Sequence, residues 1–373
     1  MTYVPSKHNL TLSTRLVRLF PLACLALFAL LSSDAHGQQE PKIAVDVKTV
    51  NVITTVRDKH GKIIPDLNQD AFALAEDGRP QNINYFAKES DLPLRLGLLV
   101  DTSLSQRRVL DQERSASYSF LDNLLREKKD LAFVVNFDFD VILLQDFTDV
   151  RPKLQAALQS LETPQLSSRG RGAGGAGGPS GGSGGDPGSG GAGGRGGGRR
   201  GGGTHLYDAV FLASDELMGK QQGRKALIIL SDGVDHGSQE TLAYAIETAQ
   251  RSDTIIYSIL YADEQGFGNH PSFGMGPGGH GGRGGRYPQQ QEHVDGKKIL
   301  EEISKKTGGR LFKVSKKETV EKIYAQIEEE LRNQYRLGYT PDKGAETGYH
   351  KIQLTTYNKD LVVQTRDGYY GGP

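Results

Sequence analysis

The spacing of apolar residues differs between the two ends of the chain and its middle. Near the start, apolar and polar residues alternate in the short runs VKTVNVITTVRD, FALAED and NINYF, with the turns DKHGK and EDGRPQ between them. Such alternation predicts half-buried β-strands. The pattern returns near the end in YRLGYTP, YHKIQLTTY and LVVQTRDGYY. Because chain ends often lie close together in a domain, we expect both ends to form one sandwich-like, all-β domain.

Between these ends, continuous apolar runs alternate with helical patterns. The runs LRLGLLVD, LAFVVNF, KALIILSD and TIIYSILYA have the composition of parallel strands that are covered on both faces. VILLQDF and RLFKV are further strands, and VVNFDFDVIL predicts a single hairpin. Helices are expected over 107–128, 149–161, 206–219, 238–252 with a serine cap, 296–309 with a terminal glycine, and 317–334. This order predicts a doubly wound, Rossmann-like α/β domain inserted in the β domain.

The N-terminus has the three parts of a secretory signal peptide. Lys7, Arg15 and Arg18 precede the apolar stretch 19–31, and a small-residue cleavage site follows at 35–37. We therefore expect export to the periplasm, the cell envelope or the medium. An uncleaved anchor is the alternative, although the apolar run is short for a membrane span.

Composition narrows the function further. The single cysteine, Cys24, lies within the signal, so the mature chain is expected to have neither disulfides nor thiol chemistry. The chain has 45 basic and 45 acidic residues, a balance that indicates neither a nucleic-acid nor a membrane-surface partner. After the signal, no apolar stretch is long enough to cross a bilayer.

Two glycine-rich segments, 167–203 and 264–292, interrupt the α/β pattern and are expected to be disordered. Arginine within glycine repeats also fits RNA binding, but the first segment has no aromatic residue to stack on bases. The predicted organisation is a signal peptide at 1–37, a β segment at 38–92, the α/β domain at 93–334 and a second β segment at 335–373.

The candidate chemistry lies where apolar strands end. LRLGLLVD ends at Asp101, with Ser103 and Ser105 on the loop that follows, and ALIILSDG places Asp232 at the end of another strand. Ligands of doubly wound sheets bind at this rim. Thr204, between a glycine run and a predicted helix, adds a third hydroxyl. Two carboxylates and three hydroxyls suit Mg²⁺, Mn²⁺ or Ca²⁺ rather than zinc or copper. The alternative is that the serines are ordinary turn residues, with Ser105 capping the helix from 107.

These segments in their order are similar to the metal-ion-dependent adhesion site of von Willebrand factor A (VWFA) domains. The phrases VRDKHGKIIPDLNQDAFALAEDGRPQNINYF, THLYDAV, GRKALIILSDGVDHGS and QYRLGYTP…RDGYY further resemble the VWFA-related proteins typical of acidobacteria, from about Val45 to Tyr370. The resemblance implies the split β architecture and a metal site at Asp101, Ser103, Ser105, Thr204 and Asp232. The long glycine insert before Thr204 departs from the family pattern.

The function expected from this site is that of an exported, non-catalytic binding or adhesion module. A protein ligand would offer an acidic residue to the bound ion. The alternatives are a metal-dependent hydrolase and an envelope scaffold in which the ion is only structural. No catalytic residue is predicted, because neither a nucleophile elbow with Ser-His-Asp order nor a phosphate-binding loop is found in the sequence.

Other polar residues near the site have simpler interpretations. Asp208 is expected to complement a helix dipole, and the acids of the NFDFD segment are expected to lie in a hairpin turn. Asp235 is a candidate for supporting the site from outside the ligand set. His205 and His236 leave open a histidine metal centre.

Overall fold

The computed structural model describes residues 49–88, 92–163, 203–261, 295–342 and 346–372. These described residues belong to one compact unit. The predicted signal peptide and nearly all of both glycine-rich segments lie outside the described residues. Among the helices that are described, none has both the length and the apolar character needed to cross a membrane.

The middle of the chain folds around a six-stranded sheet with the order β10-β9-β8-β5-β6-β7. Every neighbouring pair is parallel except β6 and β7, which form the predicted hairpin. The strands are β5 (Leu94–Asp101), β6 (Leu131–Phe137), β7 (Val141–Thr148), β8 (Arg224–Ser231), β9 (Thr254–Leu260) and β10 (Leu311–Lys313). The chain moves from β5 toward β6 and later returns to β8 on the other side of β5, so the strand order reverses between β5 and β8.

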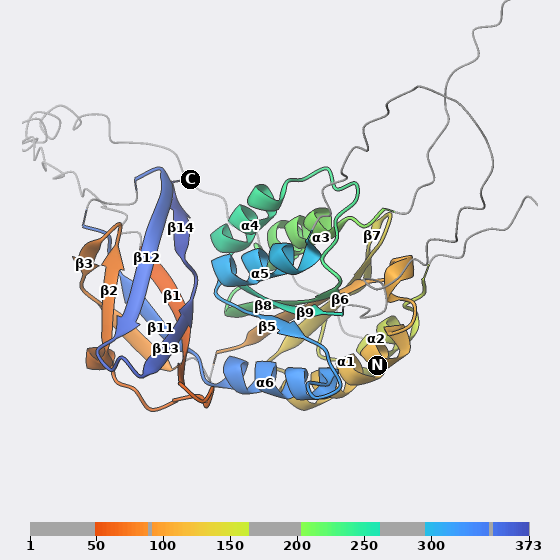
Figure 1. Cartoon of the computed structure of the whole chain (residues 1–373), viewed down its shortest axis with the longest axis horizontal. Coiled ribbons are helices and arrows are strands. Elements are labelled where there is room, and N and C mark those ends of the chain that lie inside the picture. The colour runs from red at the N-terminus through yellow and green to blue at the C-terminus, as the bar shows by residue number, and fades with distance from the viewer. Residues whose placement is uncertain (1–48, 89–91, 164–202, 262–294, 343–345, 373) are drawn as a thin grey trace, which may run out of the picture. The chain divides into compact units, whose positions relative to one another are not determined.

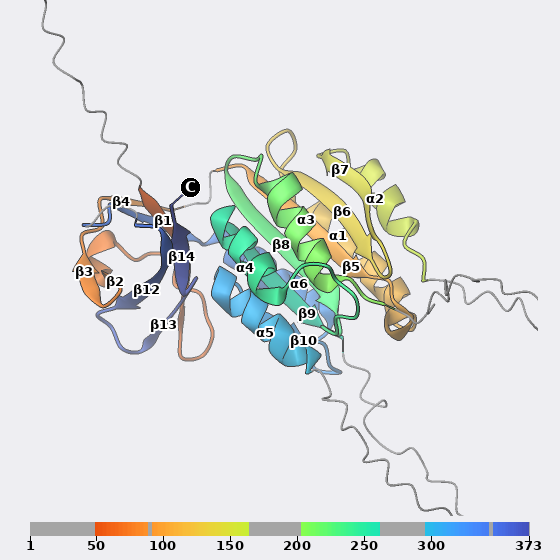
Figure 2. The ribbon, with the colours of Figure 1, turned by 90° about the horizontal axis from the view of Figure 1, so that it is seen from above.

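Helices cover both faces of this sheet (Figure 1). One face packs against α1 (Leu110–Leu124), α2 (Arg151–Gln159) and α6 (Val320–Arg332). The other packs against α3 (Leu206–Leu212), α4 (Leu242–Arg251) and α5 (Gly296–Thr307), as Figure 2 shows from above. The central strands β5 and β8 are almost entirely buried, because each has helices on both sides. The doubly wound α/β fold predicted from the sequence is therefore confirmed.

The two ends of the chain pair with each other in two four-stranded antiparallel sheets, with the orders β13-β1-β11-β4 and β14-β12-β2-β3. The segment before the α/β part contributes β1 (Val50–Asp58), β2 (Phe72–Glu76), β3 (Arg79–Gln81) and β4 (Tyr85–Lys88). The segment after it contributes β11 (Tyr335–Tyr339), β12 (Gly348–Thr356), β13 (Leu361–Thr365) and β14 (Gly368–Gly371). Apolar side chains of both sheets form one shared core, as in a β-sandwich.

Three details of the sequence prediction are wrong. The segment EDGRPQ is not all turn, because only Asp77 and Gly78 lie between β2 and β3. The first β segment consequently has four strands rather than three, and its last strand begins at Tyr85. Helix α1 is shorter than the predicted range 107–128, because residues 107–109 form a turn and the helix ends at Leu124.

The third detail is the cap of α4. Thr241 caps this helix by accepting the Tyr244 N–H, and the predicted serine does not. The glycine end of α5 is confirmed, with Gly308 in the left-handed conformation at φ 93°.

Candidate metal centre

Asp101 is the last residue of β5, and its side chain is fully buried. Its Oδ1 accepts the Ser103 N–H at 2.9 Å, and its Oδ2 accepts the Ser231 hydroxyl at 2.6 Å. Ser231 ends the adjacent strand β8. The carboxylate is therefore held at the point where the strand order reverses, by one bond from its own loop and one from the neighbouring strand.

The two loop serines lie together, as their spacing predicts. The Oγ atoms of Ser103 and Ser105 are 2.9 Å apart. Neither hydroxyl makes a capping hydrogen bond to the 3₁₀ turn or to α1, and the residue that precedes α1 is Val109. The interpretation of Ser105 as a helix cap is thus wrong, and both hydroxyl groups lie beside the Asp101 loop.

Asp232 directly follows β8 and is partly buried. Its Oδ1 accepts the Val234 N–H at 3.0 Å. Burial raises the pKa of Asp101 to about 6, hydrogen bonds from Ser103 and Ser231 oppose the shift, and the charge of Asp232 adds to it. Asp232 therefore lies close enough to Asp101 for its charge to raise the pKa of the Asp101 carboxyl group.

Thr204 precedes α3, and backbone hydrogen bonds fix its position. It exchanges N–H···O bonds with His236, at 3.2 and 2.8 Å, in an isolated β-bridge. A side chain on the preceding Gly203 would place its Cβ 2.7 Å from the His236 carbonyl oxygen. Glycine at 203 is therefore required for this close approach.

Asp138 connects the Thr204 loop with the Asp101 loop. Its carboxylate accepts the Thr102 hydroxyl at 2.9 Å, and its backbone carbonyl accepts the His205 N–H at 2.9 Å. The residues that follow Asp101 and Thr204 in the chain, Thr102 and His205, are thus both hydrogen-bonded to Asp138. The turn position of Asp138 and Asp140 is confirmed, but the linking role of Asp138 was not predicted.

Glu113 is a buried acid near the site that was also not predicted. It lies on α1 with 1% of its surface exposed, and neither carboxyl oxygen has a hydrogen-bond partner among the described residues. Burial raises its pKa well above the usual range, and the charge of Asp101 adds to the shift. The sequence feature that could have identified Glu113 is its position on the buried face of the helix, three residues after Leu110 and four before Ser117.

The remaining acids organise loops. Asp235 and Ser238 accept the Tyr207 N–H at the start of α3, and Asp208 accepts the N–H groups of Gln239 and Glu240. Asp208 therefore lies in the first turn as predicted and also anchors the loop that follows β8. Among the described residues, the group of metal-ligating type that includes a histidine lies elsewhere, at Glu76, Asp77 and His350, and not at His205 and His236.

No protein-family model matches the chain, and no curated protein matches it. Several solved structures are similar in fold. A von Willebrand factor type A protein from Catenulispora acidiphila is 10% identical with a TM-score of 0.42, over 86% of this chain and 73% of its own. An aerotolerance-related membrane protein from Bacteroides fragilis is 14% identical with a TM-score of 0.40, over 64% and 98%. Mussel byssus proximal thread matrix protein 1 with a zinc-occupied MIDAS motif is 12% identical with a TM-score of 0.39, over 69% and 49%.

Proposed function

We propose that this protein, whose α/β part has the doubly wound fold and the ordered sequence motif of a von Willebrand factor A domain, is a metal-dependent binding module. The ion would be held by Asp101, Ser103, Ser105, Thr204 and Asp232, and an acidic residue of a protein ligand would complete its coordination. The observation that carries the proposal is the buried Asp101 carboxylate at the strand-order reversal, beside the paired hydroxyls of Ser103 and Ser105.

The charge balance of the site supports a cation. Burial raises the pKa of Asp101 and of Glu113; the charge of Asp232 adds to the shift of Asp101, and the charge of Asp101 adds to the shift of Glu113. None of the ion pairs in the described part of the chain includes these three acids. A divalent ion would supply the missing positive charge, and an all-oxygen donor set suits Mg²⁺, Mn²⁺ or Ca²⁺.

The same donor set favours binding over turnover. The three hydroxyls are neutral, so two carboxylates leave the ion without a surplus of negative charge, and a ligand carboxylate remains an attractive addition. A hydrolase would also need an accessible general base beside the ion. Glu113 does not meet that need, because its side chain is buried and therefore not accessible to a substrate.

Magnesium titration by calorimetry tests the metal site. Chelator-treated wild type should bind Mg²⁺, and Asp101→Ala should lose this binding while keeping its fold, because one of two charged ligands is removed. Asp70→Ala is the matched control, since Asp70 is an exposed aspartate of the β part. Equal Mg²⁺ binding by the wild type and Asp101→Ala would overturn the proposed site.

Capture of envelope proteins on the immobilised chain tests the binding role. Specific partners should bind with Mg²⁺ present, be released by chelator and be absent from Asp101→Ala. Metal binding with unchanged capture in the variant would favour a structural ion. Asp101-dependent turnover of a peptide or phosphodiester substrate would favour the hydrolase instead.

Residues 1–37 lie outside the described residues, and the proposal includes their removal as a signal peptide during export. The mature protein should then begin near Gln38. N-terminal sequencing of the protein from the cell envelope is the direct measurement, and a protein that retains Met1 would contradict cleavage.

A further inference from the structure

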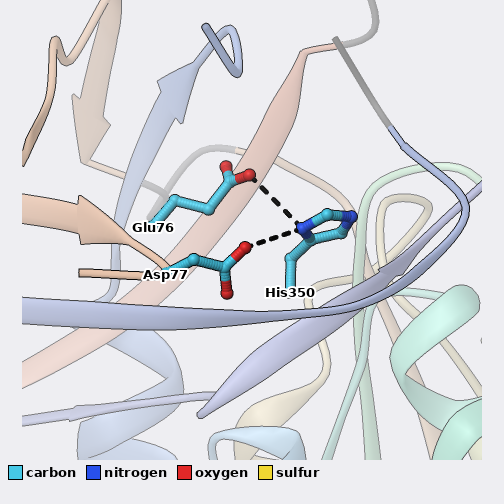
Figure 3. A group of neighbouring side chains, drawn as sticks. All are labelled: Glu76, Asp77 and His350. Carbon is cyan, nitrogen blue, oxygen red and sulfur yellow. Dashed lines mark hydrogen bonds and ion pairs between the residues drawn. The ribbon is translucent and has the colours of Figure 1, made fainter. Parts of the chain in front are cut away.

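A second group of ligand-type side chains lies in the β-sandwich (Figure 3). Glu76 ends β2, Asp77 begins the turn to β3, and His350 lies on β12, the strand that pairs with β2. The His350 Nδ1 is 2.9 Å from Asp77 Oδ2 and 3.6 Å from Glu76 Oε1. Residues 274 positions apart thus bring one nitrogen and two carboxylates to a single point.

The two ring nitrogens of His350 have different roles. Nε2 lies 3.0 Å from the backbone carbonyl oxygen of Glu346. A carbonyl oxygen only accepts hydrogen bonds, so Nε2 carries the hydrogen. Nδ1 therefore faces two carboxylates, which also only accept when ionised. A positive species is required between these three atoms, and it is either a proton on Nδ1 or a metal ion.

The surrounding residues hold the side chains of Asp77 and His350 in place without help from an ion. The Asp77 Oδ1 accepts the Lys351 N–H at 2.8 Å, which directs Oδ2 toward His350. The imidazole stacks on the Tyr369 ring, with centroids 5.2 Å apart and an interplanar angle of 27°. Metal-binding histidines commonly donate their second N–H to a backbone carbonyl, as His350 does to Glu346.

Glu76 is a buried acid of this group. The residue is 7% exposed, and the hydroxyl groups of Tyr339 and Tyr369 lie close enough to hydrogen-bond with its carboxylate. Hydroxyl groups are neutral, and a buried carboxylate is costly unless positive charge also compensates it. The side chain of Asp77 is 43% exposed, so the group has a route to solvent by which an ion enters.

We propose that Glu76, Asp77 and His350 form a metal site for zinc or a similar first-row divalent ion, distinct from the oxygen-only site of the α/β part. Metal–ligand distances of about 2.0–2.2 Å imply ligand atoms about 3.4 Å apart around a tetrahedral ion. The two distances from Nδ1 lie on either side of this value. One imidazole with two carboxylates suits a transition ion better than Mg²⁺. Water or an added ligand would fill the fourth position.

The ion would join three segments of the sandwich. The β2–β3 turn supplies Asp77, β2 supplies Glu76, and β12 comes from the other end of the chain. Because a metal that binds only the folded state stabilises it, zinc should tie the two ends of the chain together. This role is independent of the function proposed for the α/β part.

The test is a zinc titration of chelator-treated protein against a chromophoric competitor, in the Asp101→Ala background to remove the first site. This protein should bind zinc, and adding Glu76→Gln should weaken that binding by at least about tenfold. Glutamine keeps the size of the side chain and removes its charge. His60→Ala is the matched control, because His60 is an exposed histidine of the same sandwich.

A second readout separates this site from zinc held by other histidines of the chain. Zinc should raise the thermal unfolding midpoint in the Asp101→Ala background and in its His60→Ala derivative, but not in its Glu76→Gln derivative. Equal zinc affinity and equal midpoint shifts with and without Glu76→Gln would overturn the proposal. His350 would then be an imidazolium held by two carboxylates. Mg²⁺ binding by the Glu76→Gln variant of the wild type tests the first site separately.

Discussion

Two buried carboxyl groups of the α/β part, Glu113 and Asp130, have pKa values shifted in opposite directions. Burial raises the pKa of both. At Asp130, hydrogen bonds from the Arg126 guanidinium and from the N–H groups of Leu94 and Arg126 outweigh burial, and the net shift is downward. Glu113 has no such partners among the described residues, so its shift remains upward. The surroundings of each carboxyl group therefore decide the direction of its pKa shift.

Glu113→Gln should therefore change how stability depends on pH. A raised carboxyl pKa means that the folded protein binds the proton more tightly. In the wild type, the tighter proton binding of Glu113 therefore stabilises the folded state. This contribution is fully present below the pKa of the unfolded chain, about 4.3, and is lost as the pH rises through the raised pKa of the folded state. Glutamine does not titrate, so in chelator the variant should equal or exceed the wild type in stability at pH 8. Urea unfolding at pH 4 and pH 8 measures this difference. A Glu113→Gln variant that is less stable than the wild type at pH 8, but not at pH 4, would contradict this expectation.

At the scale of elements, the segment SQET between β8 and α4 offers two residues of helix-capping type. The structure uses Thr241 for α4, while Ser238 accepts the N–H groups of Tyr207 and Asp208 at the start of α3. Local sequence preference does not distinguish them, since serine and threonine are both good caps. Tertiary contact between the loop after β8 and α3 makes the choice.

Substitution of these two residues should affect different helices. Thr241→Ala should cost about 1 kcal/mol of unfolding free energy, because an N–H at the start of α4 loses its partner. Hydrogen exchange should accelerate at Tyr244 in Thr241→Ala and at Tyr207 in Ser238→Ala. Faster exchange at Tyr244 in Ser238→Ala alone would show that the serine caps α4 after all.

At the scale of the whole molecule, the sandwich depends on both ends of the chain. Strand β1 pairs with β11 and β13, and β2 pairs with β12. Glu330 of α6 adds a buried link, because its carboxylate lies 2.8 Å from both Arg57 of β1 and Arg310. The N-terminal strands therefore have their main partners hundreds of residues away.

Removal of residues 340–373 should consequently unfold the N-terminal strands. Without β12, β13 and β14, the strand β1 keeps only β11 and loses the apolar face that covers it. Hydrogen exchange at Val50, Val52 and Val56 should become fast, while the central strand β8 should stay protected. Slow exchange at all three valines after the truncation would contradict a shared sandwich.

The sequence by itself determined the elements and the polar residues at strand ends. Buried strands such as LRLGLLVD are continuous apolar runs, so Asp101 is identified as the first polar residue at a carboxyl end. Local periodicity and turn chemistry depend on residues that are near neighbours in the chain, so the amino-acid sequence alone is enough to predict them. The strand ends at Asp101 and Asp232 and the doubly wound fold class could be predicted for this reason, whereas the five-residue ligand set stays a prediction that also rests on the family resemblance.

Tertiary structure decided which of these residues meet. The division of the β strands into two sheets, the link through Asp138 and the group around His350 all depend on contacts between distant segments. Such contacts follow from the burial of the whole chain and leave no local pattern around the residues involved. Glu76 and Asp77 stand in an ordinary strand and turn, and only the pairing of β2 with β12 brings His350 to them.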